Sequence, residues 1–446
     1  MTNVSRENKL VRYIDKITLD FVMKSQWFSL NKLRELQLEG LQDLCNHARE
    51  HTKYYKNLPL IKEIEDLKQV SILTKKIIHD KFKALNADNI PSVQKWTGGT
   101  SEQVTLNTNY DQTPMIAMND RFYYWHPKNT LERAIVIWGG GELRHKQPYE
   151  VVWFNKLCGK ETPMKFYIIE WLVNEEKILE CLKDIQIFNP TSIRTYASTL
   201  RSLAFYAVKH NIRLPDLKLV INNCEPLSKD IRNLVYEAWN VPVWDFYGSQ
   251  DLGSMAYECE KHEGLHISME RYIVEVTEDG RLLWTDLFNW AMPLIRYENG
   301  DIGKFSERVC SCGRGLPLFE GVIGRTLQYL WTKQDNWLNS TEINESLYYD
   351  VPDYLKLIEA HQVQQNERGK IILWVKPWDK NILPDFSIIR KAFIDRLDID
   401  IQITDEIKRS QSGKQLTVIT KFRPPWLGKE QWTEQGVEVR GDKPNV

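Results

Sequence analysis

The segment 95–105, KWTGGTSEQVT, combines two adjacent glycines with hydroxyl side chains and a cation. Gly98 and Gly99 allow positive φ angles and let backbone N–H groups approach an anion closely. Further donors come from Lys95 and from the hydroxyl groups of Thr97, Thr100 and Ser101. A loop of this kind can hold a polyphosphate, but an ordinary β-turn between two strands also explains these residues. The loop lacks the Gly-Lys-Ser/Thr ending of the common P-loop.

Polar residues also follow two apolar strand candidates, at 222–225 (NNCE) and at 247–251 (YGSQD). Ligands bind at the carboxyl ends of the strands in open α/β sheets, so these segments are expected to meet there. In RYENGD, Asp301 follows a glycine turn, where its carboxylate can accept two hydroxyl hydrogen bonds, as a ribose requires. A plain Asn-Gly turn is the alternative.

A third group of residues has metal-ligand chemistry. Cys310 and Cys312 lie in CSCGRG, and Cys259, His262 and His266 lie about fifty residues earlier. Three thiols and one imidazole make a tetrahedral zinc set, and a closed four-ligand site is structural. The sequence leaves open whether His262 or His266 is the fourth ligand, and free intracellular thiols are the alternative.

The elements that must position these residues follow from hydrophobic periodicity. Residues 6–55 are expected to be helical, and Ser71 is expected to start another short helix. Strands alternate with helices of 10–15 residues between 115 and 248, which indicates βαβ units and a largely parallel sheet covered on both faces. Short alternating strands from 264 to 305, with a Glu278-Asp279-Gly280 hairpin turn, indicate an antiparallel β-subdomain.

The expected fold class is α/β, with a large N-terminal domain of mixed sheets and a small C-terminal α+β domain. Residues 1–324 form the large domain, with a helical layer at 1–90 and a β-subdomain at about 260–323. Residues 325–446 form the small domain and a polar tail. It is expected to contain helices near 341–350 and 386–397 and strands at 370–376, at DIQIT and at QLTVITKF.

Composition excludes several classes of protein. The 446 residues are 42% hydrophobic and 27% charged, with a net charge of −1, so no broad electrostatic attraction to nucleic acid or anionic membrane is expected. No run reaches membrane-spanning length. Seven cysteines are too sparse for a disulfide framework. A cytoplasmic location without membrane insertion is expected.

From about residue 33 to 422 the chain resembles the phenylacetate–CoA ligase-like branch of the adenylate-forming enzymes, including its CapK-type and coenzyme F390 synthetase-like members. The resemblance rests on motifs in a shared order: LCNHAREHTKYYKNL, SILTKK, WTGGTSEQVT, NNCEPLS with WDFYGSQDLG, RYENGD, VIGRTLQYL and RSQSGKQ. Seven motifs in the same order are a specific signal, although each one alone is weak.

The resemblance implies ATP, Mg²⁺ and a small carboxylic acid as ligands, and CoA or an amine as acceptor. Residues implied to hold the nucleotide are Thr97, Gly98, Gly99, Thr100, Ser101, Glu225, Tyr247, Gly248, Ser249, Asp301 and Arg325. The implied catalytic residues are Asp251, near Mg²⁺, and Lys414, which would bridge the carboxylate and the α-phosphate. By position, the acid would contact Trp138, Gly139, Gly140, Asn223 and Gln250.

The same resemblance implies structural zinc at Cys259, His266, Cys310 and Cys312, and it leaves a homodimer open. The chain departs from the family pattern at Glu102, where the phosphate loop usually has glycine, and at Asp251, which replaces glutamate. We therefore expect an acyl-adenylate-forming ligase, with a role in surface polysaccharide synthesis as one setting. A catalytically silent binding protein that retains the fold and the zinc is the alternative.

Overall fold

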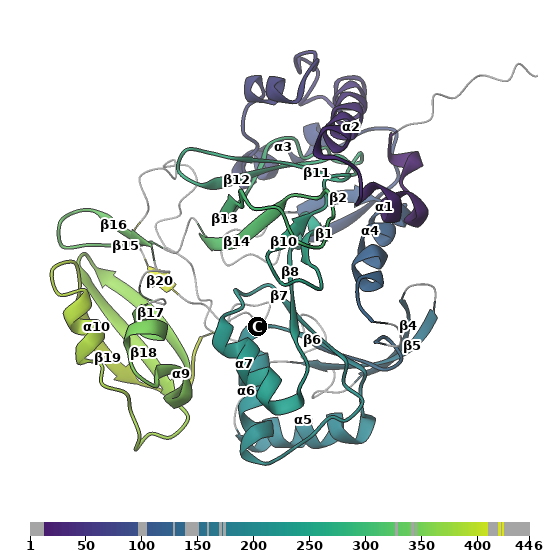
Figure 1. The fold of residues 1–446 in the computed structure, drawn as a ribbon. Coiled ribbons are helices and arrows are strands. Elements are labelled where there is room, and N and C mark those ends of the chain that lie inside the picture. Colours follow the sequence, from purple (N-terminus) through teal and green to yellow (C-terminus); the bar gives the residue numbers. More distant parts are fainter. Residues whose placement is uncertain are drawn as a thin grey trace, which may run out of the picture.

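A mixed sheet of twelve strands forms the centre of the computed structural model (Figure 1). The structure describes residues 13–96, 105–127, 130–138, 151–157, 160–168, 172, 175–325, 329–339, 343, 346–408, 418–420 and 422. The strand order is β11-β12-β13-β14-β10-β9-β8-β7-β6-β3-β5-β4. In chain order the strands are β3 (Ala134–Trp138), β4 (Val151–Leu157), β5 (Lys160–Ile168), β6 (Ser192–Thr195), β7 (Leu219–Asn223), β8 (Val243–Ser249), β9 (Gly253–Glu258), β10 (Leu265–Ile267), β11 (Tyr272–Val276), β12 (Arg281–Asp286), β13 (Tyr297–Phe305) and β14 (Leu318–Arg325).

Five neighbouring strands of this sheet, β5, β3, β6, β7 and β8, are parallel. Helices α5 (Glu175–Phe188), α6 (Ala197–Lys209) and α7 (Lys229–Trp239) cover one face of them, and their apolar residues form one core with those of the strands (Figure 1). Residues of α4 (Thr113–Tyr124) pack against the other face. The predicted α/β class with a doubly covered parallel sheet is confirmed.

The antiparallel strands continue the same sheet, because β9 pairs antiparallel with β8. The predicted Glu278-Asp279-Gly280 hairpin joins β11 to β12, and Gly280 has a φ of +81°. The glycine turn expected before Asp301 is wrong: residues 297–305 form one strand, and Gly300, at φ +89°, lies where the β12–β13 register shifts. A bulge therefore replaces the turn.

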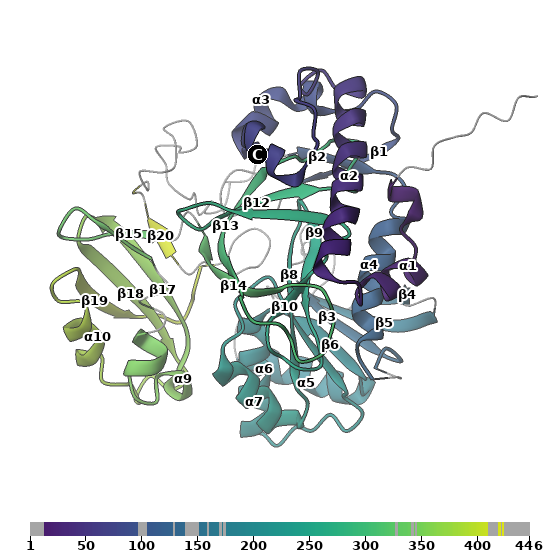
Figure 2. The ribbon, with the colours of Figure 1, turned by 45° about the horizontal axis from the view of Figure 1, so that its top comes forward.

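The N-terminal part contains a 3₁₀ turn (Tyr13–Lys16), α1 (Leu19–Ser25), α2 (Leu30–His51), a second 3₁₀ turn (Ile64–Gln69) and α3 (Lys75–Leu85). Helix α2 lies across the end of the molecule that carries the antiparallel strands (Figure 2). The region is helical as expected, but helix α3 begins after Thr74 rather than at Ser71, because the Thr74 side chain accepts from the Ile77 amide. Strands β1 (Ser92–Trp96) and β2 (Thr105–Asn109) flank the glycine-threonine loop as an antiparallel pair.

A four-stranded sheet with its own apolar core lies beside the larger part, and we call residues 329–422 the C-terminal unit (Figure 1). Its described elements are β15 (Tyr329–Trp331), β16 (Trp337–Asn339), a π-helical turn (Ser346–Asp350), α9 (Tyr354–Leu357), β17 (Ile358–Glu367), β18 (Lys370–Pro377), α10 (Ser387–Ala392), β19 (Asp398–Ile403) and β20 (Val418–Thr420). The helix expected at 386–397 is shorter, and Ser346–Asp350 lies within the helix expected near 341–350.

Helix α6 contacts the C-terminal unit. The Phe205 and Trp378 rings stack with centroids 3.7 Å apart and planes 9° apart. Arg201 donates to the backbone carbonyl of Ile358. A face-to-face aromatic contact at this distance excludes water, so it is a specific docking point between the two parts. Among the described residues, no helix is both long and apolar enough to span a bilayer.

Candidate active site and metal centre

A polar network joins β8 to β13. The Tyr247 hydroxyl donates to Asp301 Oδ2 at 2.8 Å, and Asn299 Nδ2 donates to the same oxygen at 2.8 Å. Asn299 Nδ2 also lies 3.0 Å from the Tyr247 oxygen. Asp301 is only 4% exposed and Tyr247 only 9%. Two donors on one carboxylate oxygen fix the orientation of Asp301. A residue that binds a ligand through its carboxylate needs such a fixed orientation.

Asp251 is held by the same strand. The Tyr297 hydroxyl donates to Asp251 Oδ2 at 2.6 Å. Burial, reinforced by the Asp251 carboxylate, raises the pKa of Tyr297, so this phenol stays protonated and acts as a donor. Through these hydrogen bonds, Tyr297, Asn299 and Asp301 of β13 act together on the end of β8 and on Asp251 just beyond it.

The side chain of Lys95 adds a cation near Asp251. Burial and the neighbouring Arg271 lower the pKa of Lys95, while the Asp286 and Asp251 carboxylates favour its charged form. Lys95 is the last residue but one of β1, just before the glycine-threonine loop. The loop residues Thr97, Gly98, Gly99, Thr100 and Ser101 lie outside the described residues, as do Glu102, Gly139, Gly140 and Lys414.

Backbone geometry gives the position of one further predicted residue, Arg325, and the reason for glycine at another, Gly248. Arg325 is the partner of Asp301 in the β13–β14 register, so its backbone lies beside the network. At Gly248, a Cβ atom would lie 2.6 Å from the Gly253 carbonyl oxygen and 2.9 Å from the Phe246 ring. Glycine is therefore required there by the close approach of β8 and β9.

The remaining predicted residues lie at strand ends. Trp138 ends β3, Asn223 ends β7 and Ser249 ends β8, so the parallel strands bring them to one edge of the sheet. Glu225, two residues beyond β7, has its carbonyl bound by Asn222 Nδ2 at 2.8 Å. Gln250 is exposed. These side chains form the border that we call the strand-end site.

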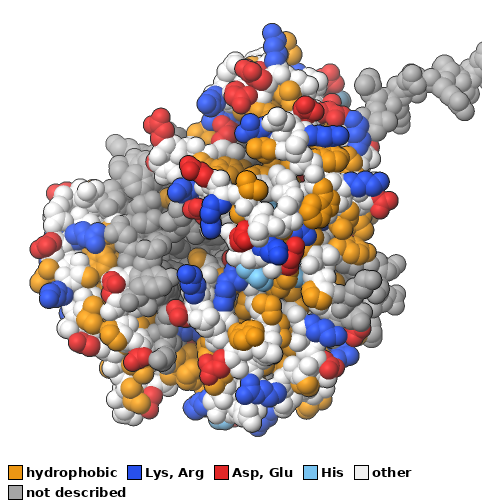
Figure 3. Space-filling view, in the orientation of Figure 1, with side chains coloured by type: hydrophobic (Ala, Val, Ile, Leu, Met, Phe, Trp, Pro, Cys, Tyr) orange, Lys and Arg blue, Asp and Glu red, His pale blue; other side chains and the backbone are white. Residues whose placement is uncertain are grey.

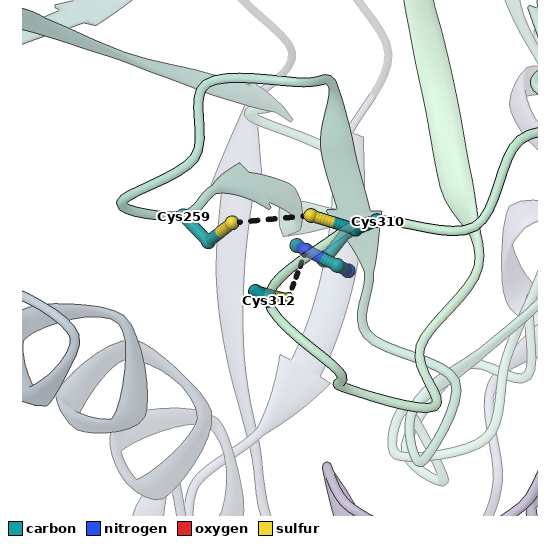
Figure 4. A group of neighbouring side chains, drawn as sticks. Cys259, Cys310 and Cys312 are labelled. Carbon is teal, nitrogen blue, oxygen red and sulfur yellow. Dashed lines mark hydrogen bonds between the residues drawn. The ribbon is translucent and has the colours of Figure 1, made fainter.

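The four predicted metal ligands converge (Figure 4). The ligand atoms of Cys259, His266, Cys310 and Cys312 all lie within 4.8 Å of one another. Cys259 Sγ is 3.6 Å from Cys310 Sγ, and Cys312 Sγ is 3.4 Å from His266 Nε2. Zinc–sulfur and zinc–nitrogen bonds of ordinary length in a tetrahedron separate two sulfurs by about 3.8 Å and a sulfur from a nitrogen by about 3.5 Å. The observed spacings fit this geometry.

The surroundings of these residues also suit a metal. His266 Nδ1 lies 2.9 Å from the Leu316 carbonyl oxygen, which places the proton on Nδ1 and leaves Nε2 free to act as a ligand. His262 is used differently, because its Nδ1 lies 3.0 Å from Glu258 Oε2. The structure thus groups His266, and not His262, with the three thiols.

Three polar residues near the site were not anticipated: Tyr297, Asn299 and Arg194. The first two belong to RYENGD, where the alternation Tyr-x-Asn-x-Asp was a strand signal hidden by the interpretation of Asn-Gly as a turn. Arg194 lies inside the apolar strand segment SIRT, and a single charge there carried no distinguishing pattern.

Comparison with known proteins finds two curated relatives and many similar folds. Phenylacetate-coenzyme A ligase from Thermus thermophilus is 31% identical over 330 residues, covering 66% of this chain and 71% of that protein. Protein CapK from Staphylococcus aureus is 22% identical over 422 residues, covering 88% and 90%. A structure of 2-hydroxyisobutyryl-CoA ligase in the postadenylation state has a TM-score of 0.68 at 15% identity, covering 89% of this chain and 91% of that one. No protein-family profile matches.

The fold and the ordered motifs therefore define an adenylate-forming enzyme. Within that class the chain belongs to the phenylacetate–coenzyme A ligase family and is also similar to CapK.

Proposed function

We propose that the protein activates a carboxylic acid with ATP and Mg²⁺. A carboxylate oxygen attacks the α-phosphorus of ATP, the bond to the β,γ-pyrophosphate breaks, and an acyl-adenylate forms. A thiol or amine then attacks the acyl carbon, AMP leaves with the electron pair, and the acceptor loses its proton. The products are pyrophosphate, AMP and a thioester or amide.

The observation that supports this function most directly is the fixed carboxylate of Asp301 beside the backbone of Arg325. In our proposal Asp301 and Arg325 bind the ribose hydroxyls, and Tyr247 and Gly248 border the adenine and the reacting carboxylate. Residues 97–101, next to Lys95, hold the β- and γ-phosphates. Asp251 lies near Mg²⁺, which supplies charge neutralisation on the phosphates when bound.

The C-terminal unit belongs to a smaller mobile domain, residues 325–446, in this proposal. Lys414 from that domain stabilises the charge that develops between the carboxylate and the α-phosphate. Several Lys and Arg side chains lie on the face of the larger part that borders the C-terminal unit, which suits the approach of an anionic nucleotide (Figure 3). A rotation near Arg325 then exchanges Lys414 for the acceptor.

We further propose that Cys259, His266, Cys310 and Cys312 hold a structural zinc ion that ties β10 to the 310–316 turn. The acceptor is CoA or an amine. The similarity to CapK supports an acceptor from surface polysaccharide synthesis, and a homodimer fits the proposal equally.

The test is pyrophosphate release by the full chain with ATP, Mg²⁺ and a panel of carboxylic acids. We expect release with at least one acid, and loss of release in Lys414→Ala with an unchanged melting temperature. If no acid gives release and ATP does not raise the melting temperature, the alternative of a catalytically silent binding protein is correct. Glu102 and the short carboxylate of Asp251 are the features that would explain such a result.

A further inference from the structure

Arg194 is a charged residue in the middle of the parallel sheet. It is the last residue but one of β6, opposite Val136 of β3 and Ile221 of β7. Asn223 lies two positions beyond Ile221 and faces the same side of the sheet. Arg194 is half-buried. Because it lies near the end of β6, it is close to the carboxyl edge of the sheet, below the strand-end site.

Aromatic rings and two neutral partners surround the guanidinium. Its carbon lies 5.0 Å from the Phe246 ring centre and 5.7 Å from that of Trp138. Arg194 Nε donates to Asn223 Oδ1 at 2.8 Å, and Nη1 lies at 3.4 Å from the Tyr123 hydroxyl. An arginine has five N–H donors, so this arrangement leaves donors for a further acceptor.

Three other enclosed arginines in the described part of the chain pair with carboxylates. Arg121 pairs with Glu270, Arg271 with Asp286, and Arg232 with Glu258, at 2.6–2.8 Å. Arg194 has no carboxylate partner within the described residues. A cation enclosed by apolar groups is costly to leave unpaired, and a bidentate carboxylate is the partner that its planar fork fits best.

We propose that Arg194 selects the acid substrate by binding a second carboxylate, so that the substrate class is a dicarboxylic acid or an acidic amino acid. This inference rests on the proposed function, because it assumes that the strand-end site receives the acid. The reacting carboxylate lies at the strand ends near Gly248, and the second carboxylate extends inward between Trp138 and Phe246 to the guanidinium.

The experiment compares acids that differ in one charge at nearly constant size. Pyrophosphate release is measured with glutamate and glutamine, aspartate and asparagine, succinate and succinamate, and glutarate and glutaramate. For at least one pair we expect the wild-type kcat/KM to favour the charged acid by about 100-fold, the effect of hydrogen bonds to a charged group in an enclosed site.

Two substitutions test the role of the side chain. Arg194→Gln should abolish the preference within that pair, mainly through the KM for the acid, and leave the KM for ATP unchanged. Arg194→Lys keeps the charge but loses the fork, and should retain part of the preference. The matched control is Arg133→Gln, which removes a guanidinium from just before the amino end of β3, where it pairs with Asp216 at 2.7 Å. It should keep the full preference.

Binding of each acid, followed by the shift in melting temperature with ATP present, gives a second readout that does not need turnover. The inference is overturned if the amide member of every pair is preferred or equal. It is also overturned if Arg194→Gln lowers turnover of all acids alike or raises the KM for ATP, which would place the guanidinium on the nucleotide. If only acids without a second charge are turned over, the role of Arg194 is overturned and the proposed function stands. If no acid is turned over, both the role of Arg194 and the proposed function are overturned.

Discussion

The Tyr247 hydroxyl donates to Asp301 at 2.8 Å across 54 residues of sequence. The bond joins the end of a parallel strand, β8, to an antiparallel strand, β13, within one continuous sheet. Because Asn299 donates to the same oxygen, the Asp301 carboxylate is held in a fixed direction. The candidate ribose site is therefore prepared before any ligand arrives.

Tyr247→Phe is expected to raise the KM for ATP by about 10-fold, because Asp301 loses an orienting donor in a buried site. Stability should change little, since the ring keeps its contacts with Trp284 and Phe319. Pyrophosphate release at varied ATP concentration measures the effect. Tyr257→Phe, whose hydroxyl bonds Asn119 instead, is the control. An unchanged KM for ATP in Tyr247→Phe would show that Asp301 is not oriented by this bond.

The zinc proposal predicts one bound zinc per chain by elemental analysis. Cys310→Ser and His266→Ala should each lose the metal and lower the free energy of unfolding by roughly 3–5 kcal/mol, because metal binding contributes to folding. His262→Ala should keep the metal. Retention of full metal content by His266→Ala together with its loss in His262→Ala would reverse our assignment of the fourth ligand.

The buried carboxyl of Asp245 gives a pH-dependent prediction. Burial, then the neighbouring Glu258, raise its pKa from 3.8 to about 6, against the opposing effects of Asn222 and Arg232. The folded state therefore holds the proton more tightly than the unfolded chain does. The contribution of Asp245 protonation to the free energy of unfolding is fully present below about pH 4 and is lost as the pH rises through about 6.

Asp245→Asn is never charged, and its side-chain oxygen can still accept from Asn222 and from the Phe246 amide. We expect this variant to be more stable than the wild type by on the order of 1 kcal/mol at pH 8, with the difference vanishing towards pH 4. Urea unfolding at both pH values measures it. A stability difference that does not depend on pH would contradict the shifted pKa.

The stacked pair Phe205–Trp378 predicts a conformational effect. Trp378→Ala should weaken docking of the C-terminal unit by the interaction free energy of one aromatic pair. We expect the single-turnover rate of adenylation to fall by about 2- to 12-fold. Trp374→Ala is the control, since Trp374 bonds Gln364 within the C-terminal sheet. Equal rates for Trp378→Ala and the control would mean that this contact does not contribute to adenylation.

Cys224 has a φ of +68°, a left-handed conformation that disfavours side chains, immediately after Asn223. Cys224→Gly is therefore expected to be more stable than Cys224→Ala by about 1 kcal/mol, because both lose the sulfur but only glycine loses the strain. Thermal unfolding of the two variants makes the comparison. If alanine is the more stable of the two, backbone strain does not dominate at this position.

The sequence by itself determined the local elements and the ordered motifs. Short apolar runs were sufficient for β3 and β7, and hydrophobic periodicity was sufficient for α6 and α7. The sequence also identified the residues of the candidate metal site, because cysteine and histidine are infrequent enough to be noticed. Their chemistry depends on residue type, which the sequence states directly.

Only the tertiary structure decided how distant segments meet. It brought Tyr297, Asn299 and Asp301 of the bulged strand β13 to the end of β8, and it grouped His266 rather than His262 with the thiols. It also placed Arg194 among aromatic rings with no acidic partner among the described residues. Strand register and backbone φ angles control these outcomes. Both depend on long-range pairing, so they cannot be deduced from neighbours along the chain.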